Sequence, residues 1–322
     1  MKAVVYYNYG SPDVLKCEEI EKPTPGDNEV LIRVRAASLN ALDWRLMRGG
    51  PYILRMLFGL RKPKSAQPGR VGRDVAGQVE AVGRNVTRFK PGDEVFGVCP
   101  GACAEYACAN EDKLALKPVH LSFEDAAALP VAASTALQGL RDKGRIQQGH
   151  RVLVDGASGG VGTFAVQIAK SFGAEVTAVC STRNVDMARS MGADRVIDYT
   201  QEDFTRSGQR YDLIIAANAY HSIFNYRRAM VQNGIYVMAG GGWVQMLQVV
   251  LLGPLLSLVG RKKMRLFMAN INPEDLALLK DLLEAGKIDP VIDRRYPLSE
   301  VPEAIRYLEE GHARGKVIIN TN

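Results

Sequence analysis

Apolar and polar residues follow two different patterns along this chain. Before about residue 121, short runs alternate between apolar and polar positions, as expected for half-buried strands, and they lie at 29–36, 75–82 and 93–98. Glycine and proline separate these runs and mark turns between them. The first third of the chain is therefore expected to form a β-rich module.

From residue 151 onward, strand-like and helix-like segments alternate. Strands are expected at 151–157, 175–181, 195–199, 211–219 and 235–241, with helices at 160–174, 185–193 and 222–230. Two further helices precede a last strand, and these three elements lie at 273–286, 299–311 and 316–320. The alternation predicts an α/β fold with a doubly wound parallel sheet.

A glycine-rich turn joins the first of these strands to the first helix. Gly156, Gly159 and Gly162 are spaced three residues apart in the segment GASGGVG. Glycine lets the backbone approach a ligand closely, and the amide groups that open a helix favour an anion such as a pyrophosphate. The same glycines would also suit a tight turn without a ligand. Their place inside a βαβ unit favours dinucleotide binding.

The end of the next predicted strand distinguishes between two dinucleotides. A site for NAD usually has an acid there, which accepts a hydrogen bond from the ribose 2′-hydroxyl group. This chain has Ser181, Thr182 and Arg183 instead, and no acid. Hydroxyl and guanidinium groups suit the 2′-phosphate of NADP, although an ordinary exposed arginine would fit the same position. The pattern favours NADP(H).

Composition narrows the class of protein. The 322 residues are 47% hydrophobic and 24% charged, with a net charge of +6, which excludes a disordered or collagen-like chain. Five cysteines are few for this length and odd in number, so we expect reduced thiols in a cytoplasmic protein. The first ten residues do not resemble a secretory signal. Basic residues cluster at 61–64 and 261–265 without interleaved aromatic residues, so no nucleic-acid partner is expected.

The apolar run MLQVVLLGPLLSLV at 246–259 allows two interpretations. It is shorter than the ~20 residues of a membrane span and contains Pro254, which favours a buried helix pair, a subunit contact or the wall of an apolar pocket. The basic residues that follow the run favour a membrane segment instead. We expect no membrane span.

Five short motifs resemble the medium-chain dehydrogenase/reductase superfamily: GRDVAG at 72–77, KPGDEV at 90–95, ALP at 128–130, STA at 134–136 and GHARGK at 311–316. The chain resembles in particular the zinc-free quinone oxidoreductase branch, including the reticulon-interacting mitochondrial type, and the likeness covers essentially its whole length. It implies a GroES-like catalytic domain at 1–121 and 268–322. It also implies an NADP-binding Rossmann domain at 122–267.

The resemblance permits a test for catalytic zinc. Zinc alcohol dehydrogenases place two cysteines and a histidine where this chain has Asn40, Val131 and Arg73, and none of these three side chains suits zinc. The three cysteines at 99–108 are one too few for the structural zinc site of that family. The four histidines show no ligand spacing. We therefore expect no metal.

Further site residues are implied by the resemblance alone. Asn40, Asp43 and Thr135 would lie near the nicotinamide, and the alternatives are a helix cap, a first-turn acid and a packing residue, respectively. Lys316 is near the cofactor in this comparison but as readily starts the last strand. The residues around the cofactor would be Ser158, Gly159, Gly160, Val161, Ser181, Arg183, Tyr199, Asn218, Gly240, Gly241, Phe267, His312, Ala313 and Arg314.

Together these features predict an NADPH-dependent, zinc-independent reductase of a small apolar quinone or α,β-unsaturated carbonyl, whose carbonyl group already polarises the accepting carbon. The alternatives are a non-catalytic NADPH-binding sensor or scaffold, and an enoyl reductase of a lipid or polyketide pathway. Solvent can supply the proton, and Tyr52 is a minor candidate donor. We expect a homodimer that pairs through strand 234–241 at a sheet edge.

Overall fold

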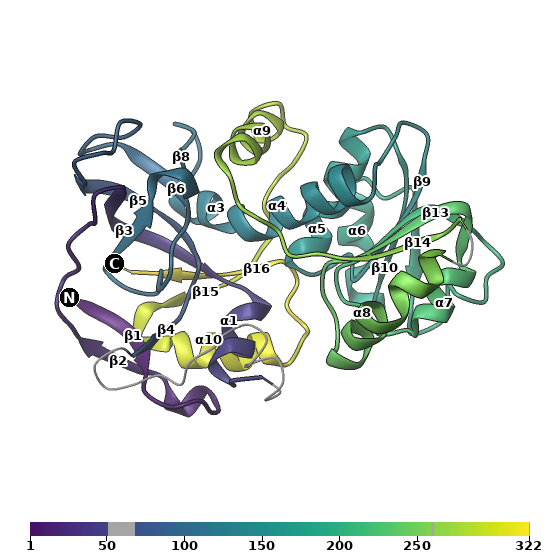
Figure 1. Ribbon diagram of the computed structural model, residues 1–322, viewed down its shortest axis with the longest axis horizontal. Helices are drawn as coiled ribbons and strands as arrows, with labels where there is room; N and C mark the ends of the chain where they lie inside the picture. The colour runs from purple at the N-terminus through teal and green to yellow at the C-terminus, as the bar shows by residue number, and fades with distance from the viewer. Residues whose placement is uncertain (51–67, 259–260, 322) are drawn as a thin grey trace. The chain divides into compact units, whose positions relative to one another are not determined.

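The computed structural model describes residues 1–50, 68–258 and 261–321, and within them the chain forms two compact units (Figure 1). The candidate proton donor Tyr52 and the basic cluster at 61–64 lie outside the described residues. The first unit comprises Met1–Val131, Ile271–Lys280 and Ile292–Asn322, and the second comprises Ala132–Asn270 and Asp281–Val291.

The first unit is β-rich, as the alternating runs predict. Its strands are β1 (Lys2–Tyr6), β2 (Lys16–Glu19), β3 (Glu29–Leu39), β4 (Gly69–Arg70), β5 (Asp74–Val82), β6 (Glu94–Val98), β7 (Tyr106–Asn110), β8 (Leu114–Leu116), β15 (Ile292–Pro297) and β16 (Lys316–Asn320). The larger sheet has the order β15-β16-β3-β5-β6-β8, with β7 also paired to β3, and a small sheet has the order β2-β1-β4. The predicted runs therefore correspond to β3, β5 and β6.

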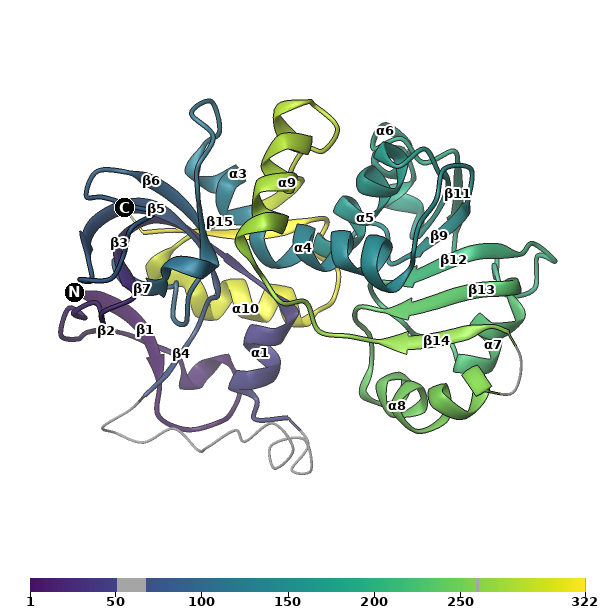
Figure 2. The same cartoon turned by 45° about the horizontal axis from the view of Figure 1, so that its top comes forward.

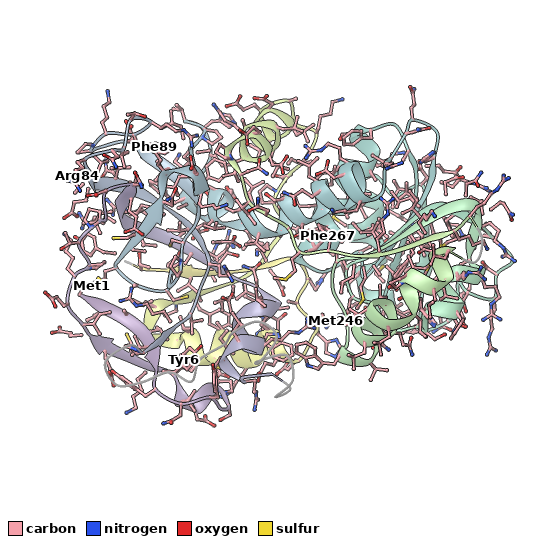
Figure 3. All side chains as sticks on the ribbon, viewed as in Figure 1. Met1, Tyr6, Arg84, Phe89, Met246 and Phe267 are labelled. Atoms are coloured by element: carbon pink, nitrogen blue, oxygen red, sulfur yellow. The ribbon has the colours of Figure 1, made fainter. Side chains whose placement is uncertain are left out.

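Strand β3 is the centre of the first unit. It is hydrogen-bonded to β16, β5 and β7, and its apolar residues Val30, Ile32 and Val34 are buried. Tyr6 and Phe89, which are labelled in Figure 3, belong to the same core. Helices α1 (Ala41–Met47), α3 (Phe123–Ala128) and α10 (Val301–Glu309) also belong to this unit. Because β16 contributes Val317 and Ile319 to the same core as Val4 and Tyr6, this core joins residues that are more than 300 positions apart in the sequence.

The boundaries of the two units differ from those expected at 121/122 and 267/268. Helix α3 packs on β3, β5 and β16 and buries its alanines there, so 122–131 belong to the first unit. The side-chain amide of Gln138 on α4 (Pro130–Gln138) donates to the carbonyl of Asn270 at 2.7 Å and accepts its N–H at 3.1 Å. This exchange joins 268–270 to the second unit.

The second unit contains the predicted parallel sheet. Its strands are β9 (Arg151–Asp155), β10 (Glu175–Cys180), β11 (Arg195–Asp198), β12 (Tyr211–Ala216), β13 (Met230–Met238) and β14 (Lys263–Leu266). They run parallel in the order β11-β10-β9-β12-β13-β14. The order reverses direction between β9 and β12, and a doubly wound sheet binds ligands at the carboxyl ends of the strands at such a point.

Helices cover this sheet on both faces. They are α5 (Gly160–Ser171), α6 (Val185–Ser190), α7 (Ile223–Arg228) and α8 (Trp243–Leu258). Right-handed crossovers place α5 and α6 on one face and α7 and α8 on the other. Figures 1 and 2 both show α7 beside α8, and the two helices are in contact. One more helix, α9 (Pro273–Glu284), follows β14, and it belongs to the first unit up to Lys280 and to the second unit from Asp281.

Two expectations about the apolar run at 246–259 and the strand before it were wrong. Strand β13 is not at the sheet edge, because Lys263–Leu266 forms β14 and pairs with it. This short strand, KMRL, was not predicted from the sequence because its basic residues interrupt the apolar pattern of a buried strand. Within the described residues, the apolar run forms one helix, α8, rather than a buried helix pair, and the buried residues of this helix are Val249 and Gly253. A subunit contact and the wall of an apolar pocket stay open as interpretations of the run. Among the described helices, none combines the length and hydropathy needed to cross a bilayer.

Candidate functional site

A buried ammonium group lies at the centre of a polar network in the first unit. The Lys316 side chain is 2% exposed, and its Nζ donates to Asn40 Oδ1 at 2.7 Å, to Asp74 Oδ2 at 3.1 Å and to the Leu39 carbonyl at 3.3 Å. Asn40 Nδ2 donates to the same Asp74 oxygen at 2.9 Å. The other Asp74 oxygen accepts the N–H of Val131 at 2.8 Å. Every polar atom of these three side chains that faces the interior therefore has a partner.

Strand register brings these residues together. Lys316 is the first residue of β16, and its neighbour Val317 lies opposite Leu39 at the end of β3. Asp74 is the first residue of β5 and lies opposite Ser38. Asn40 directly follows β3 and is the N-cap of α1. The carboxyl end of β3 therefore holds one residue from each of three elements that are far apart in the sequence.

The donor set of this network does not fit zinc. Zinc requires imidazole, thiolate or carboxylate ligands around an open position, whereas Asn40 and Val131 supply an amide and an isopropyl group. The Lys316 ammonium is already bound to Asn40 and to Asp74, and its positive charge opposes a second cation there. Burial raises the pKa of the Cys99 thiol to about 12 and that of Cys108 to about 11, which disfavours the thiolate that zinc needs.

Asn40 and Asp43 have the structural roles that were the alternatives to catalysis. The Asn40 N–H donates to Asp43 Oδ2 at 2.7 Å in a capping box at the start of α1. Burial raises the pKa of Asp43 to about 6, and this bond opposes the rise. The charge of Asp74 raises the pKa further, while that of Lys316 lowers it. Both polar atoms of the Asn40 side chain are engaged by Lys316 and Asp74.

In the second unit, glycines form a cradle where the sheet reverses direction. Gly156 follows β9 with φ +79°, and a Cβ there would lie 2.8 Å from Asn218 Cβ. A Cβ on Gly162 would lie 2.0 Å from the Gly156 carbonyl oxygen, so neither position accepts a side chain. The predicted Asn218, which follows β12, therefore borders the glycine turn. This close packing is the arrangement that a pyrophosphate needs in order to reach the backbone.

The first turn of α5 supplies the donors for such an anion. Gly159 is the N-cap with no side-chain capping bond, and Gly160 and Val161 are the first helical residues. Their N–H groups have no partner within the helix, and the helix dipole favours negative charge at this end. Ser158 precedes them in the same turn. The predicted phosphate residues are thus brought together at the carboxyl edge of the sheet, and they fit a dinucleotide.

Gly240 and Gly241 border the same edge. Beyond β13, the Gly240 N–H donates to the Ala216 carbonyl at 3.1 Å and the Gly240 carbonyl accepts the Ala219 N–H at 3.0 Å. A Cβ on Gly240 would lie 2.3 Å from the Ala217 carbonyl oxygen. The two predicted glycines therefore allow the chain after β13 to run close beside the chain after β12.

Ser181, Arg183 and Tyr199 lie at the ends of β10 and β11. Ser181 Oγ accepts a bond from Asn184 at 3.1 Å, Arg183 is exposed, and the Tyr199 N–H donates to the Cys180 carbonyl at 3.0 Å. The segment 181–183 contains no acid, but an acid from another strand lies beside it. Asp198, the last residue of β11, lies opposite Cys180, and its carboxylate accepts the Thr182 hydroxyl at 2.6 Å. Only the pairing of β11 with β10 reveals this neighbour.

The comparisons with known proteins agree with this geometry. Residues 26–119 match the family described as alcohol dehydrogenase GroES-like domain, and 191–319 match that described as zinc-binding dehydrogenase. The chain is 39% identical over 335 residues to 2-methylene-furan-3-one reductase of Solanum lycopersicum, with 99% of this chain and 79% of the relative covered. The chain belongs to the medium-chain dehydrogenase/reductase superfamily.

Two further relatives place the chain within this superfamily. It is 35% identical to the mitochondrial NAD(P)H oxidoreductase RTN4IP1 of Mus musculus, with 99% of this chain and 89% of the relative covered. The structure of the quinone oxidoreductase from Coxiella burnetii superposes with a TM-score of 0.89 at 31% identity, covering 100% of this chain and 99% of that one. The predicted resemblance to the quinone oxidoreductase-like branch is confirmed, as are the GroES-like and Rossmann folds.

One buried acid of this superfamily member was not predicted. Asp155 ends β9 directly before the glycine turn, and its Oδ2 accepts the Tyr226 hydroxyl at 2.5 Å. Its Oδ1 is buried without a hydrogen-bond partner among the described residues. Burial raises the pKa of Asp155 to about 7, and the bonds from Tyr226 and the Gly156 N–H oppose the rise. An acid at the buried end of a strand in VLVDGASGG was the available signal.

The remaining predicted residues are divided between the two units. Thr135 is nearly buried on α4, and Phe267 follows β14 and lies close to Gly139, both in the second unit. His312, Ala313 and Arg314 belong to the first unit, where the Arg314 N–H donates to Asp293 Oδ2 at 2.8 Å. Contacts of these residues with a cofactor stay predictions.

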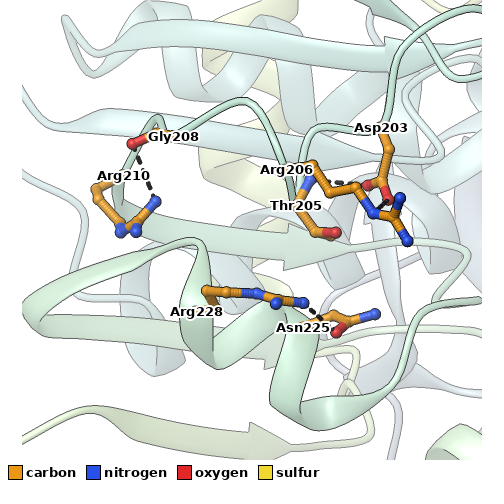
Figure 4. A pocket seen from close by; sticks show the side chains of 7 residues that line it. All are labelled: Asp203, Thr205, Arg206, Gly208, Arg210, Asn225 and Arg228. Atoms are coloured by element: carbon orange, nitrogen blue, oxygen red, sulfur yellow. Dashed lines mark hydrogen bonds and ion pairs between the residues drawn. The ribbon is translucent and has the colours of Figure 1, made fainter.

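A pocket of about 540 Å³ lies away from the glycine cradle (Figure 4). Gly208 and Arg210 precede β12 and Arg228 precedes β13, so the pocket is at the amino-terminal edge of the parallel sheet. Dinucleotides bind at the opposite edge in this fold. This pocket is therefore not the candidate cofactor site.

Lys316→Met tests the network of the first unit. Methionine leaves the Asp74 carboxylate buried without its cation, and breaking such a buried pair typically costs about 3–5 kcal/mol. We expect urea unfolding to show a loss of this size, and a smaller loss when Asp74→Asn is added. Exposed Lys287→Met is the control. Wild-type stability in Lys316→Met would contradict the role assigned to this lysine.

Asp155→Asn tests the raised pKa of the Asp155 carboxyl group in the second unit. Between pH 3.8 and about 7 the folded chain keeps a proton on Asp155 that the unfolded chain releases, so wild-type stability falls as pH rises through this window. The asparagine variant has no titratable group at this position, so it lacks this pH-dependent loss of stability. From pH 5 to pH 8 its unfolding free energy should therefore rise by about 2–3 kcal/mol relative to wild type. Urea titrations at both pH values measure this change, with the exposed Asp281→Asn as control. If the difference in unfolding free energy between variant and wild type is the same at pH 5 and pH 8, Asp155 does not hold a proton in the folded protein.

Proposed function

We propose that this protein is an NADPH-dependent, zinc-independent reductase of quinones or α,β-unsaturated carbonyl compounds. The observation that carries the proposal is the glycine cradle at the reversal point of the sheet, where side chains are excluded and the first turn of α5 offers free N–H groups. The names of the relatives support the substrate class, since one is a 2-methylene-furan-3-one reductase and another is a quinone oxidoreductase.

The residues of the second unit would hold NADPH, which supplies a hydride when bound. Gly160 and Val161 N–H groups would bind the pyrophosphate, and Ser181 and Arg183 would bind the 2′-phosphate. Asp198 is close to this position, but its carboxylate is engaged by the hydroxyls of Thr182 and Thr200. It is therefore less suited than a free acid to accept a ribose 2′-hydroxyl group.

Zinc independence rests on the first unit. Lys316 and Asp74 neutralise each other beside Asn40, so this position offers no ligand set for a Lewis acid. Quinones and enones do not require one, because their own carbonyl polarises the carbon that accepts hydride. Asn40, Asp43 and Thr135 near the nicotinamide stay part of the proposal. Since Asn40 is fixed by three neighbours, its role there is that of a positioning residue.

Turnover tests the proposal directly. We expect the protein to oxidise NADPH in the presence of quinones and small enones, and to keep this activity after treatment with a strong chelator. NADPH oxidation is followed by absorbance over a panel of both substrate classes, with elemental analysis of the same sample. Binding of NADPH without turnover of any acceptor would favour the sensor or scaffold alternative. About one tightly held zinc per chain would refute the metal-free mechanism.

Arg183→Ala tests the choice of cofactor. A charge-assisted contact to the 2′-phosphate contributes about 1.5–3 kcal/mol, so the variant should bind NADPH roughly ten- to a hundredfold more weakly. NADH binding should barely change, and the loss should shrink at high salt. Titrations of both cofactors measure this, with Arg189→Ala on α6 as the control. Equal loss of NADPH and NADH would show that Arg183 does not read the phosphate.

We also propose a homodimer in a reducing compartment such as the cytoplasm. Among the described residues, the parallel sheet ends at β11 on one side and at β14 on the other, and open strand edges such as that of β14 favour pairing with another copy. The five cysteines are all free thiols, which suits a reducing compartment. Light scattering at micromolar concentration should give the mass of two chains, and the mass of one chain would rule out this assembly.

A further inference from the structure

Helix α8 presents a continuous apolar stripe to solvent. Its members recur at intervals of three and four residues, so they share one face of the helix. They are Val244, Leu247, Leu251, Leu255 and Leu258, between 48% and 80% exposed. The other face is packed, with Val249 buried and Met246, Leu252 and Leu256 against the core of the second unit. Met246 is labelled in Figure 3.

The stripe has no polar interruption and no charged residue. The helix sequence WVQMLQVVLLGPLLSL contains no acid and no base. A helix that faced water would carry charged side chains on its open face, and contiguous exposed apolar surface instead marks an interaction site. The stripe therefore has the character of an interaction site rather than of a solvated surface.

Cations gather at the carboxyl end of α8. This end lies at the amino-terminal edge of the sheet, because the helix returns from the end of β13 to the start of β14. Lys262 Nζ donates to the Arg227 carbonyl at 2.8 Å. Burial and the charges of Arg227 and Arg210 lower the pKa of Lys262, and burial and Arg145 lower that of Arg265. These basic groups thus repel one another.

Acids in the neighbouring segments do not balance this charge. Asp203 is paired with Arg206, and Asp212 at the start of β12 is paired with Arg151. Arg261 and Lys263 are exposed directly beyond the helix, and Arg228 is exposed on α7. The carboxyl end of the stripe therefore carries an excess of positive charge.

We propose that α8 and the cations at its carboxyl end dock this protein on an anionic phospholipid surface. The leucine stripe would lie at the boundary between headgroups and acyl chains, and the cations would contact lipid phosphates. An apolar face flanked by basic residues has this complementarity. At 16 residues α8 is too short to span a bilayer but long enough to lie in its surface.

A second copy of this chain is the competing occupant, and charge argues against it. The charge-free helix of a partner copy offers no acid to the cations. A partner whose α8 ran parallel to this one would place the cations at the carboxyl end of one helix against those of the other. An anionic lipid surface supplies the missing charge. The proposal does not depend on the proposed reaction.

Vesicle sedimentation with the full chain tests this proposal. Vesicles of three parts phosphatidylcholine to one part phosphatidylserine should bind wild type, and pure phosphatidylcholine vesicles should bind it much more weakly. The variant Leu251→Glu with Leu255→Glu should bind at least tenfold more weakly. Arg261→Ala and Lys263→Ala should each weaken binding roughly fivefold at low salt. Val119→Glu, at an exposed apolar position of the first unit, is the control and should bind like wild type.

Light scattering and thermal unfolding of the same variants complete the test. The alanine variants alter only exposed side chains, so they keep the proposal testable if the glutamate variant does not fold. Wild type that fails to bind anionic vesicles, or binds both vesicle types equally, would overturn the proposal. So would a glutamate variant that becomes monomeric while its vesicle binding is unchanged, because a second copy would then be the occupant of the stripe.

Discussion

The first unit depends on one buried ion pair, between Lys316 and Asp74. Neither side chain is more than 2% exposed, so each charge has lost its hydration and the other must compensate for it. Compensation is complete because Asn40, Leu39 and Val131 supply the remaining hydrogen bonds. The same contacts fix the end of β3 relative to β5, β16 and the start of α1. The negative charge of Asp74 is thus balanced internally by the protein's own ammonium group.

The second unit is governed by a different constraint, the absence of side chains at the carboxyl edge of its sheet. Gly156, Gly162 and Gly240 each lie where a Cβ would collide with backbone or with Asn218. The backbone can therefore come close enough to a ligand to bind it with N–H groups alone. Asp155 is buried beneath this turn at a cost in solvation, and the Tyr226 hydroxyl offsets part of that cost. Electrostatics thus organises the first unit and steric exclusion the second.

Sequence patterns predicted the parts of the structure that depend on local order. The strand–turn–helix with Gly156 and Gly162 was predicted because its glycines lie within one short segment of the sequence. Strands β3, β5 and β6 were predicted because apolar and polar residues alternate within each of them. Pairing between distant segments could not be read in the same way. Lys316 was predicted only as the start of a strand or a residue near the cofactor, and its partner Asp74 is 242 residues away. Asp198 was missed because only strand register places it beside Cys180, and β14 because basic residues interrupt its hydrophobicity.

Lys316 follows every residue of the second unit along the chain, and this order has a consequence for how the protein is made. All residues of the second unit lie between Ala132 and Val291, so that unit can close while the chain is still being synthesised. The first unit cannot, because β16 has not yet emerged and β3 lacks a neighbour. Until β16 emerges, Asp74 and Asn40 lack the Lys316 ammonium group, which follows them by 242 and 276 residues along the chain. The nascent chain therefore passes through a state with one folded unit and one incomplete sheet. The unpaired strand edge of that sheet requires protection by chaperones.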